Sequence, residues 1–285
     1  MKKVLIILLS LVLLTGCFGT NEETTKIAYT TYYPLEYVTN YLYGKFATVK
    51  SIYPNGTDPA SYELTDKQKT IYAKASAFIY AGVSSEVKLA ADFINSNPSI
   101  NIVDGTKGVS FTDDISELWL DPSNYLMIAR NIKSTLIDYT SSLYDEEKIS
   151  NLYNELKVGI SEIDVELTMM GKNASRNNIF VTDNVFNFLK KYNINVISVD
   201  SKNESNTRSY NEAKTLISKG DIKYAFTIKG KTLDSEIETF IKNNNLEIVE
   251  IDPMYTLSEE QRKDGHDYIS IMNDNITKFK TELFR

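Results

Sequence analysis

The segment DEEKISNLYNELKVGISEIDVELTMMG, residues 145–171, decides the fold, because it is the longest helical pattern in the chain. Its apolar residues recur in steps of three and four, which places them on one face of a helix: Ile149, Leu152, Leu156, Ile160, Ile163, Leu167 and Met170. A helix of this length extends for about 40 Å. The pattern therefore predicts a stiff helix that runs along two smaller units and joins them.

Short apolar runs alternate with helical patterns on both sides of this segment, which is typical of βαβ units and parallel sheets. The expected strands are KIAYTTY, VKSIYP, AFIYAG and INIVDG before it, and NIFVTD, INVISVD, IKYAFTI and LEIVEID after it. We therefore expect an α/β fold of two lobes, each with a mainly parallel sheet flanked by helices, joined by one long linking helix. The expected boundaries are an N-terminal lobe at 26–143, the linking helix at 144–172 and a C-terminal lobe at 173–285.

The N-terminus is typical of a targeting segment. Lys2 and Lys3 precede the apolar run VLIILLSLVLL, which is short for a membrane span. The following LTGC matches the bacterial lipobox, in which the cysteine is acylated after cleavage. We expect residues 1–16 to be a lipoprotein signal peptide, Cys17 to carry the lipid and residues 17–25 to form a flexible tether. The protein would then be anchored on the outer face of a cytoplasmic membrane.

Composition excludes several classes of function. The chain of 285 residues has a formal net charge of -7 and no basic cluster interleaved with aromatic residues, so a nucleic-acid partner is not expected. Cys17 is the only cysteine, which excludes a disulfide or a thiolate metal site within one chain.

Four loops follow expected strands or precede expected helices, where ligand sites of open α/β sheets lie. The first is YPNGTDPASYELTDKQ, residues 53–68, a turn-rich loop that leads into a helix start. The second contains ELWLDP, in which Trp119 is expected in the core and Asp121 is expected to cap a helix that begins at Pro122. The third and fourth place Asp183 and Asp252 at strand ends.

These motifs make the chain similar to the zinc and manganese solute-binding lipoproteins of bacterial ABC transporters. The family's loop reads Asp-Pro-His-x-Tyr-Glu, and DPASYE places Ala60 where the family has a histidine ligand. The family's His-Val-Trp-Leu-Asp-Pro appears as ELWLDP, which places Glu117 at the second histidine. The resemblance further places Asp183 and Asp252 at the third and fourth ligand positions.

The resemblance implies a monomeric, lipid-anchored binding protein that captures a divalent cation, manganese or zinc, between its lobes. It would pass this cargo to an ABC permease and its ATPase, and would not be an enzyme. The implied metal ligands are Glu117, Asp183 and Asp252, and the position left vacant at Ala60 would be filled by a water or by a nearby side chain: Asp58, Ser61, Tyr62 or Glu63. Carboxylates suit manganese, magnesium or calcium, whereas zinc favours sites with imidazole or thiolate.

Two other functions remain open at this point. One is a divergent relative that binds a non-metal ligand or acts as a surface adhesion module; the other is a hydrolase that uses Glu117 and Asp183. His266, the only histidine, is expected on the surface at a helix start rather than at the site. Lys229 discriminates between the alternatives, because an ammonium group among the acids would weaken the metal hypothesis.

Overall fold

The structure is a computed structural model that describes residues 26–111, 114–200 and 206–285. The expected signal peptide, the lipidation site Cys17 and the tether lie outside the described residues. Within the described ranges, no helix has both the length and the apolar character needed to cross a membrane.

The N-terminal lobe contains a four-stranded sheet in the order β2-β1-β3-β4, and every neighbouring pair is parallel. Its strands are β1 (Ile27–Thr30), β2 (Thr48–Ser51), β3 (Ala77–Tyr80) and β4 (Asn101–Asp104). Its helices up to β4 are α2 (Tyr33–Tyr43), α3 (Asp66–Tyr72) and α4 (Ser84–Ser96). A capping box formed by Thr65 and Gln68 starts α3, which explains why the loop before it ends there.

The C-terminal lobe repeats this plan with the order β6-β5-β7-β8, again parallel throughout. Its strands are β5 (Asn178–Val181), β6 (Asn195–Ser198), β7 (Tyr224–Ile228) and β8 (Glu247–Ile251). Between them lie η1 (Asn184–Tyr192), α8 (Thr207–Ser218) and α9 (Ser235–Asn243). The expected two-lobed α/β fold with parallel sheets is confirmed.

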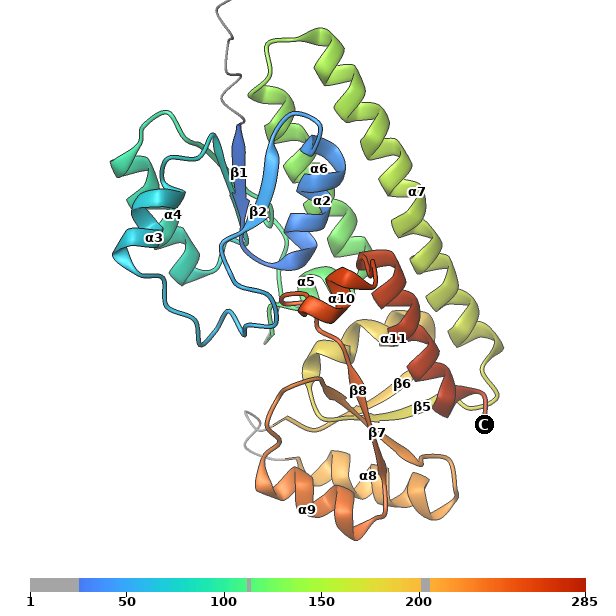
Figure 1. Cartoon of the computed structure of the whole chain (residues 1–285). Coiled ribbons are helices and arrows are strands. Elements are labelled where there is room, and N and C mark those ends of the chain that lie inside the picture. The colour runs from blue at the N-terminus through green and yellow to red at the C-terminus, as the bar shows by residue number, and fades with distance from the viewer. Residues whose placement is uncertain (1–25, 112–113, 201–205) are drawn as a thin grey trace, which may run out of the picture.

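The two lobes are connected by α5 (Glu117–Leu120), α6 (Pro122–Asp138) and the 31-residue helix α7 (Leu143–Asn173). Figure 1 shows α7 running alongside the N-terminal lobe and continuing past α11 (Tyr268–Leu283). The predicted apolar stripe is buried, with Leu152 partly buried at its edge. Asp121 caps α6 as predicted, since its carboxylate accepts a hydrogen bond of 2.9 Å from the Ser123 amide.

One hydrophobic core extends through both lobes. The same cluster of buried side chains contains Leu35 from α2, Leu156 from α7 and Phe226 from β7. Each lobe also has a smaller cluster of its own, but the largest core is shared, so we expect the lobes to unfold together.

The chain returns to the N-terminal lobe after β8, through the loop 252–258 and α10 (Glu259–Lys263). The buried indole of Trp119 donates a hydrogen bond of 2.7 Å to the Pro253 carbonyl oxygen. The Arg262 guanidinium donates to both carboxylate oxygens of Glu36, at 2.9 and 2.8 Å. This bidentate pair fixes α10 against α2 and so sets the position of the loop 252–258.

Candidate functional site

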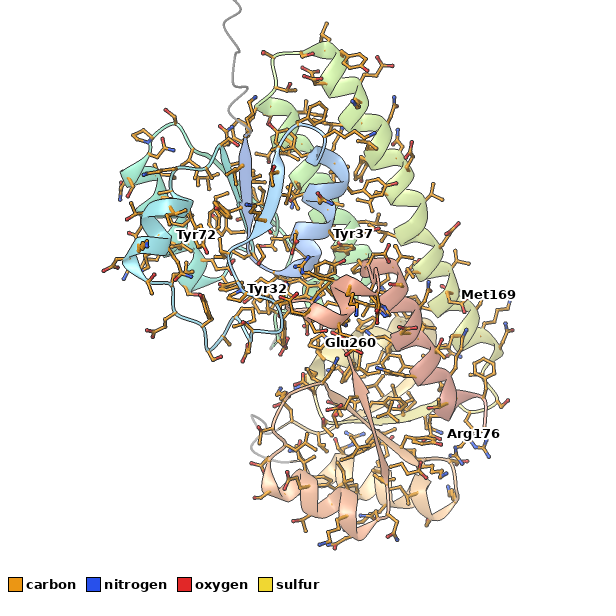
Figure 2. The ribbon with its side chains drawn as sticks, in the orientation of Figure 1. Tyr32, Tyr37, Tyr72, Met169, Arg176 and Glu260 are labelled. Carbon is orange, nitrogen blue, oxygen red and sulfur yellow. The ribbon has the colours of Figure 1, made fainter. Side chains whose placement is uncertain are left out.

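A cleft of about 620 Å³ lies where the two lobes meet. Figure 2 shows Tyr32, one of its lining residues, at the end of the N-terminal lobe that faces the C-terminal lobe. Charged and aromatic side chains from both lobes line it: Tyr32, Asp58 and Asp114 from the N-terminal side, and Lys229, Lys231, Asp252 and Tyr255 from the C-terminal side. Its volume is in the range of small-molecule binding sites.

The loop 53–68 forms part of the cleft wall and is held in a defined shape. Asp58 accepts a hydrogen bond of 2.9 Å from the Ala60 amide, which makes a local turn. Thr256 of the opposite lobe donates to the Thr57 carbonyl oxygen at 2.8 Å. Asp58 and Ala60 both line the cleft, so the position matching the family's first histidine faces it but carries only a methyl group.

The other three residues considered for the vacant position lie outside the cleft lining. Ser61 donates to the Asp58 carbonyl oxygen at 3.1 Å. The Tyr62 hydroxyl accepts from the Gln68 side chain at 2.7 Å, and Glu63 is exposed. Of the four, only Asp58 is placed where it could contact a ligand in the cleft.

Asp252 follows β8 and is firmly oriented at the cleft. One carboxylate oxygen accepts from the Met254 amide at 2.9 Å. The other accepts from the Gln261 amide group at 2.9 Å and lies 3.4 Å from the ammonium of Lys229. The basic neighbour considered from the sequence is therefore at the site, and it weakens the case for a preformed metal centre.

Asp183 follows β5 and is almost fully buried, with 1% of its side chain exposed. Its carboxylate accepts from the Val185 amide at 2.9 Å and contacts the ammonium of Lys231. Burial raises the pKa of Asp183, and the contact with Lys231 partly offsets this effect. Asp183 is absent from the cleft lining, but it contacts Lys231, which lines the cleft.

Glu117 is absent from the cleft lining, as is Asp183, so of the three expected metal ligands only Asp252 lines the cleft. Glu117 is the first residue of α5 and is half-buried, and its amide donates to the Asp114 carbonyl oxygen at 3.1 Å. The next three residues of α5 are buried in the core, which fixes the orientation of this short helix. In its place Asp114, three residues earlier, lines the cleft.

Asp114 is a site residue that sequence reasoning missed. Its carboxylate accepts from the Ser116 amide at 2.8 Å and from the Ser116 hydroxyl at 2.6 Å. The Tyr255 hydroxyl lies 2.7 Å from each of its oxygens. Burial and the charge of Asp114 together raise the pKa of Tyr255. The only sequence signal was position, since Asp114 lies three residues before Glu117, the first residue of the ELWLDP motif.

A second missed acid, Glu86, lies deeper in the N-terminal lobe. It is buried, and it accepts from the Ala81 amide at 2.9 Å and from the Tyr53 hydroxyl at 3.3 Å. Burial raises the pKa of Glu86 to about 8. The centre of the Tyr53 ring lies 6.0 Å from that of Tyr32, which lines the cleft. Glu86 is therefore connected to the cleft through these two tyrosines.

The described residues contain no group of three or more His, Cys, Asp or Glu side chains that could hold a metal ion in this structure. The acids at the cleft are instead accompanied by two ammonium groups and by neutral donors. His266 precedes the cap of α11 and is absent from the cleft lining, as expected. The cleft has the size of a small-molecule site and is lined by both carboxylate and ammonium groups.

Comparison with known proteins gives a family match over almost the entire chain. The profile of the family described as ZnuA, zinc-uptake complex component A, periplasmic, matches residues 28–282. This range includes both lobes and the linking helix.

Curated relatives are similar at low identity. The zinc-binding lipoprotein AdcA of Streptococcus pneumoniae is 24% identical over 311 residues, with 98% of this chain and 61% of the relative covered. The zinc-binding protein AdcA of Streptococcus pyogenes is 21% identical over 318 residues, with 97% of this chain and 61% of that relative covered. The chain thus spans 61% of the length of these relatives.

Solved structures share the fold. The Zn(II)-bound ZnuA-like domain of Streptococcus pneumoniae AdcA has a TM-score of 0.71 at 19% identity, covering 92% of this chain and 100% of that one. The metal-dependent lipoprotein YcdH of Bacillus subtilis has a TM-score of 0.74 at 18% identity, with the same coverage. At these identities the likeness concerns the fold alone.

Proposed function

This chain belongs to the zinc-uptake complex component A family, and from that premise we propose that it is the solute-binding component of an ABC importer. Its cargo is a divalent cation, captured in the cleft between the lobes. Its family is one of uptake components, which agrees with the expectation that the chain is not an enzyme.

The observation that carries this proposal is the excess of acid at the cleft. Asp58, Asp114 and Asp252 line it, and Asp183 contacts Lys231 of the lining. Against these acids, the described lining residues supply two positive charges, those of Lys229 and Lys231. A cleft with an excess of negative charge attracts cations and raises their local concentration.

The donor set decides which cations fit. Among the described residues that line the cleft there is no imidazole and no thiol, so the metal ligands available from them are oxygen atoms. Carboxylates can bind zinc, which otherwise favours nitrogen and sulfur, and they suit manganese and calcium well. Zinc is the first cargo to test because the relatives are named as zinc-binding proteins; manganese is the alternative that oxygen ligands favour.

The test is thermal unfolding of purified protein after metal has been removed with a chelator. Zinc, manganese, calcium and magnesium are added in turn. A cation that binds only the folded state stabilises it by about 2.7 kcal/mol at a hundredfold excess over Kd. We expect this stabilisation in the wild type and in Asp264→Asn, an exposed acid outside the cleft, but not in Asp252→Asn. Equal shifts in Asp252→Asn and the wild type, or no shift with any cation, would refute the proposal.

A second cargo class is favoured by the cleft's size and by its ammonium groups. A volume of about 620 Å³ exceeds the space that one ion requires, and Lys229 and Lys231 could bind an anionic group. A small organic acid would then be captured without metal. Stabilisation of chelator-treated protein by such acids, with no response to cations, would select this class.

Membrane anchoring belongs to the same proposal. The lipobox cysteine Cys17 would hold the protein on the outer face of the cytoplasmic membrane, next to the permease and its ATPase. Relatives named as lipoproteins support this location. Cys17→Ala should abolish acylation and cleavage, and mass spectrometry of the membrane fraction would detect this. An unmodified Cys17 in the wild-type protein would contradict the assignment.

A further inference from the structure

Lys229 and Lys231 contact the two acids of the C-terminal lobe that match the family's ligand positions. The Lys229 ammonium lies 3.4 Å from Asp252, and the Lys231 ammonium contacts Asp183. We infer that these two ammonium groups take the place of a metal cation at Asp183 and Asp252, so that cargo binds only by displacing them. The inference deepens the proposed function and rests on it for the identity of the cargo.

The sheet topology explains how one short turn supplies both lysines. β7 lies between β5 and β8, so the turn at its end is adjacent both to Asp183 after β5 and to Asp252 after β8. The Lys231 amide donates to the Ile228 carbonyl oxygen at 3.1 Å, closing a four-residue turn. Gly230, its third residue, has a φ of 80°, the conformation that a type II turn requires. Residues 229 and 231 are thereby directed to opposite neighbours.

The lysine contacts compensate charge that the folded protein would otherwise leave unbalanced. A carboxylate as buried as that of Asp183 is costly to ionise without a positive partner. Lys231 supplies that partner from the cleft side. Each lysine contributes one positive charge at the position where a cargo ion would contribute two.

The lysines are nevertheless free to move away. Their side chains are 52% exposed for Lys229 and 37% exposed for Lys231, and each has a flexible four-carbon stem. The orientation of the Asp252 carboxylate does not depend on Lys229, because the Met254 amide and the Gln261 side chain also donate hydrogen bonds of 2.9 Å to it. Removal of Lys229 should therefore leave a correctly oriented carboxylate.

The experiment compares metal affinity in Lys229→Met and Lys231→Met with the wild type, after treatment with chelator. Methionine keeps much of the side-chain bulk and removes the charge. We expect zinc or manganese to bind each variant about tenfold or more tightly, because close charge pairs in binding sites are worth at least that factor. We also expect lower melting temperatures without metal, with zinc or manganese restoring stability. Lys191→Met is the control, since Lys191 contacts Asp121 outside the cleft.

The outcomes separate this inference from the proposed function. If the wild type binds no cation but either cleft variant does, the inference holds and the proposed cargo is wrong. If the wild type binds a cation and the cleft variants bind it no more tightly, the proposal of a cation cargo is retained and the inference about the lysines is wrong. If neither variant binds any cation, the lysines are simple structural counter-ions and the inference is overturned. Lys229→Met provides this test even if Lys231→Met does not fold.

Discussion

The hydroxyl of Tyr255 lies 2.7 Å from both carboxylate oxygens of Asp114, which joins the loop after β8 to the loop before α5. This contact connects the two lobes directly at the cleft. It also orients one of the acids that would meet the cargo.

Tyr255→Phe removes this connection without removing the ring. Hydrogen bonds to charged groups typically contribute about 1.5–3 kcal/mol, and the Ser116 donors to Asp114 remain, so we expect a loss of stability of about 1–2 kcal/mol. Chemical denaturation would measure it. Tyr144→Phe, at an exposed position on α7, should change stability little. Equal stability of Tyr255→Phe and the wild type would show that Asp114 is held by other contacts.

The large core shared by both lobes predicts cooperative unfolding. Leu156 on α7 is 3% exposed and belongs to the core that contains residues of both lobes. Leu156→Asp buries an unpaired carboxylate, which costs several kcal/mol and is comparable with typical domain stability. We expect circular dichroism to show loss of both lobes in one transition. Val158→Asp, 59% exposed on the same helix, is the matched control. A melt of the Leu156 variant like that of the wild type would rule out a structural role for this face of α7.

The buried Glu86 predicts a pH dependence of stability. Its pKa rises from 4.5 in the unfolded chain to about 8 in the fold, so the folded state binds its proton more tightly. Stability should therefore fall as pH rises from about 4.5, with the full penalty present above about 8.

Glu86→Gln removes this titration while keeping a similar shape. We expect the variant to be more stable than the wild type above pH 8, by an amount of the order of a few kcal/mol, and the difference to vanish below the unfolded-state pKa. Denaturation across this pH range measures it. Glu238→Gln, at an exposed position on α9, provides the control. A difference that does not vary with pH would mean that Glu86 does not titrate in this way.

The fold could be predicted from sequence because its signals are local. Most of the strands lie in short apolar runs, such as AFIY in β3 and YAFTI in β7, and the stripe on α7 repeats with helical spacing. The site depends on features that a single sequence does not show. Asp114 lines the cleft and Glu117 does not, and Lys231 reaches Asp183 because β7 and β5 are neighbours in the sheet.

Ala60→His tests whether the loop 53–68 still presents its side chain to the cargo. The position lines the cleft, so an imidazole there would add the nitrogen ligand that zinc favours. We expect zinc affinity to rise about tenfold, equivalent to about 1.4 kcal/mol, with a smaller change for manganese. Calorimetric titration measures both ions. Glu63→His, on the same loop outside the cleft lining, should leave zinc affinity unchanged. An equal gain in both variants would indicate nonspecific binding by the added histidine.

Capture of a divalent cation in the cleft is tested most directly by anomalous diffraction from crystals of the wild-type protein grown with zinc. The account predicts a peak between the lobes, about 2.0–2.2 Å from a carboxylate oxygen of Asp252, with the Lys229 ammonium moved away. Absence of a zinc peak from the cleft, with Lys229 still in contact with Asp252 and Lys231 with Asp183, would contradict the account.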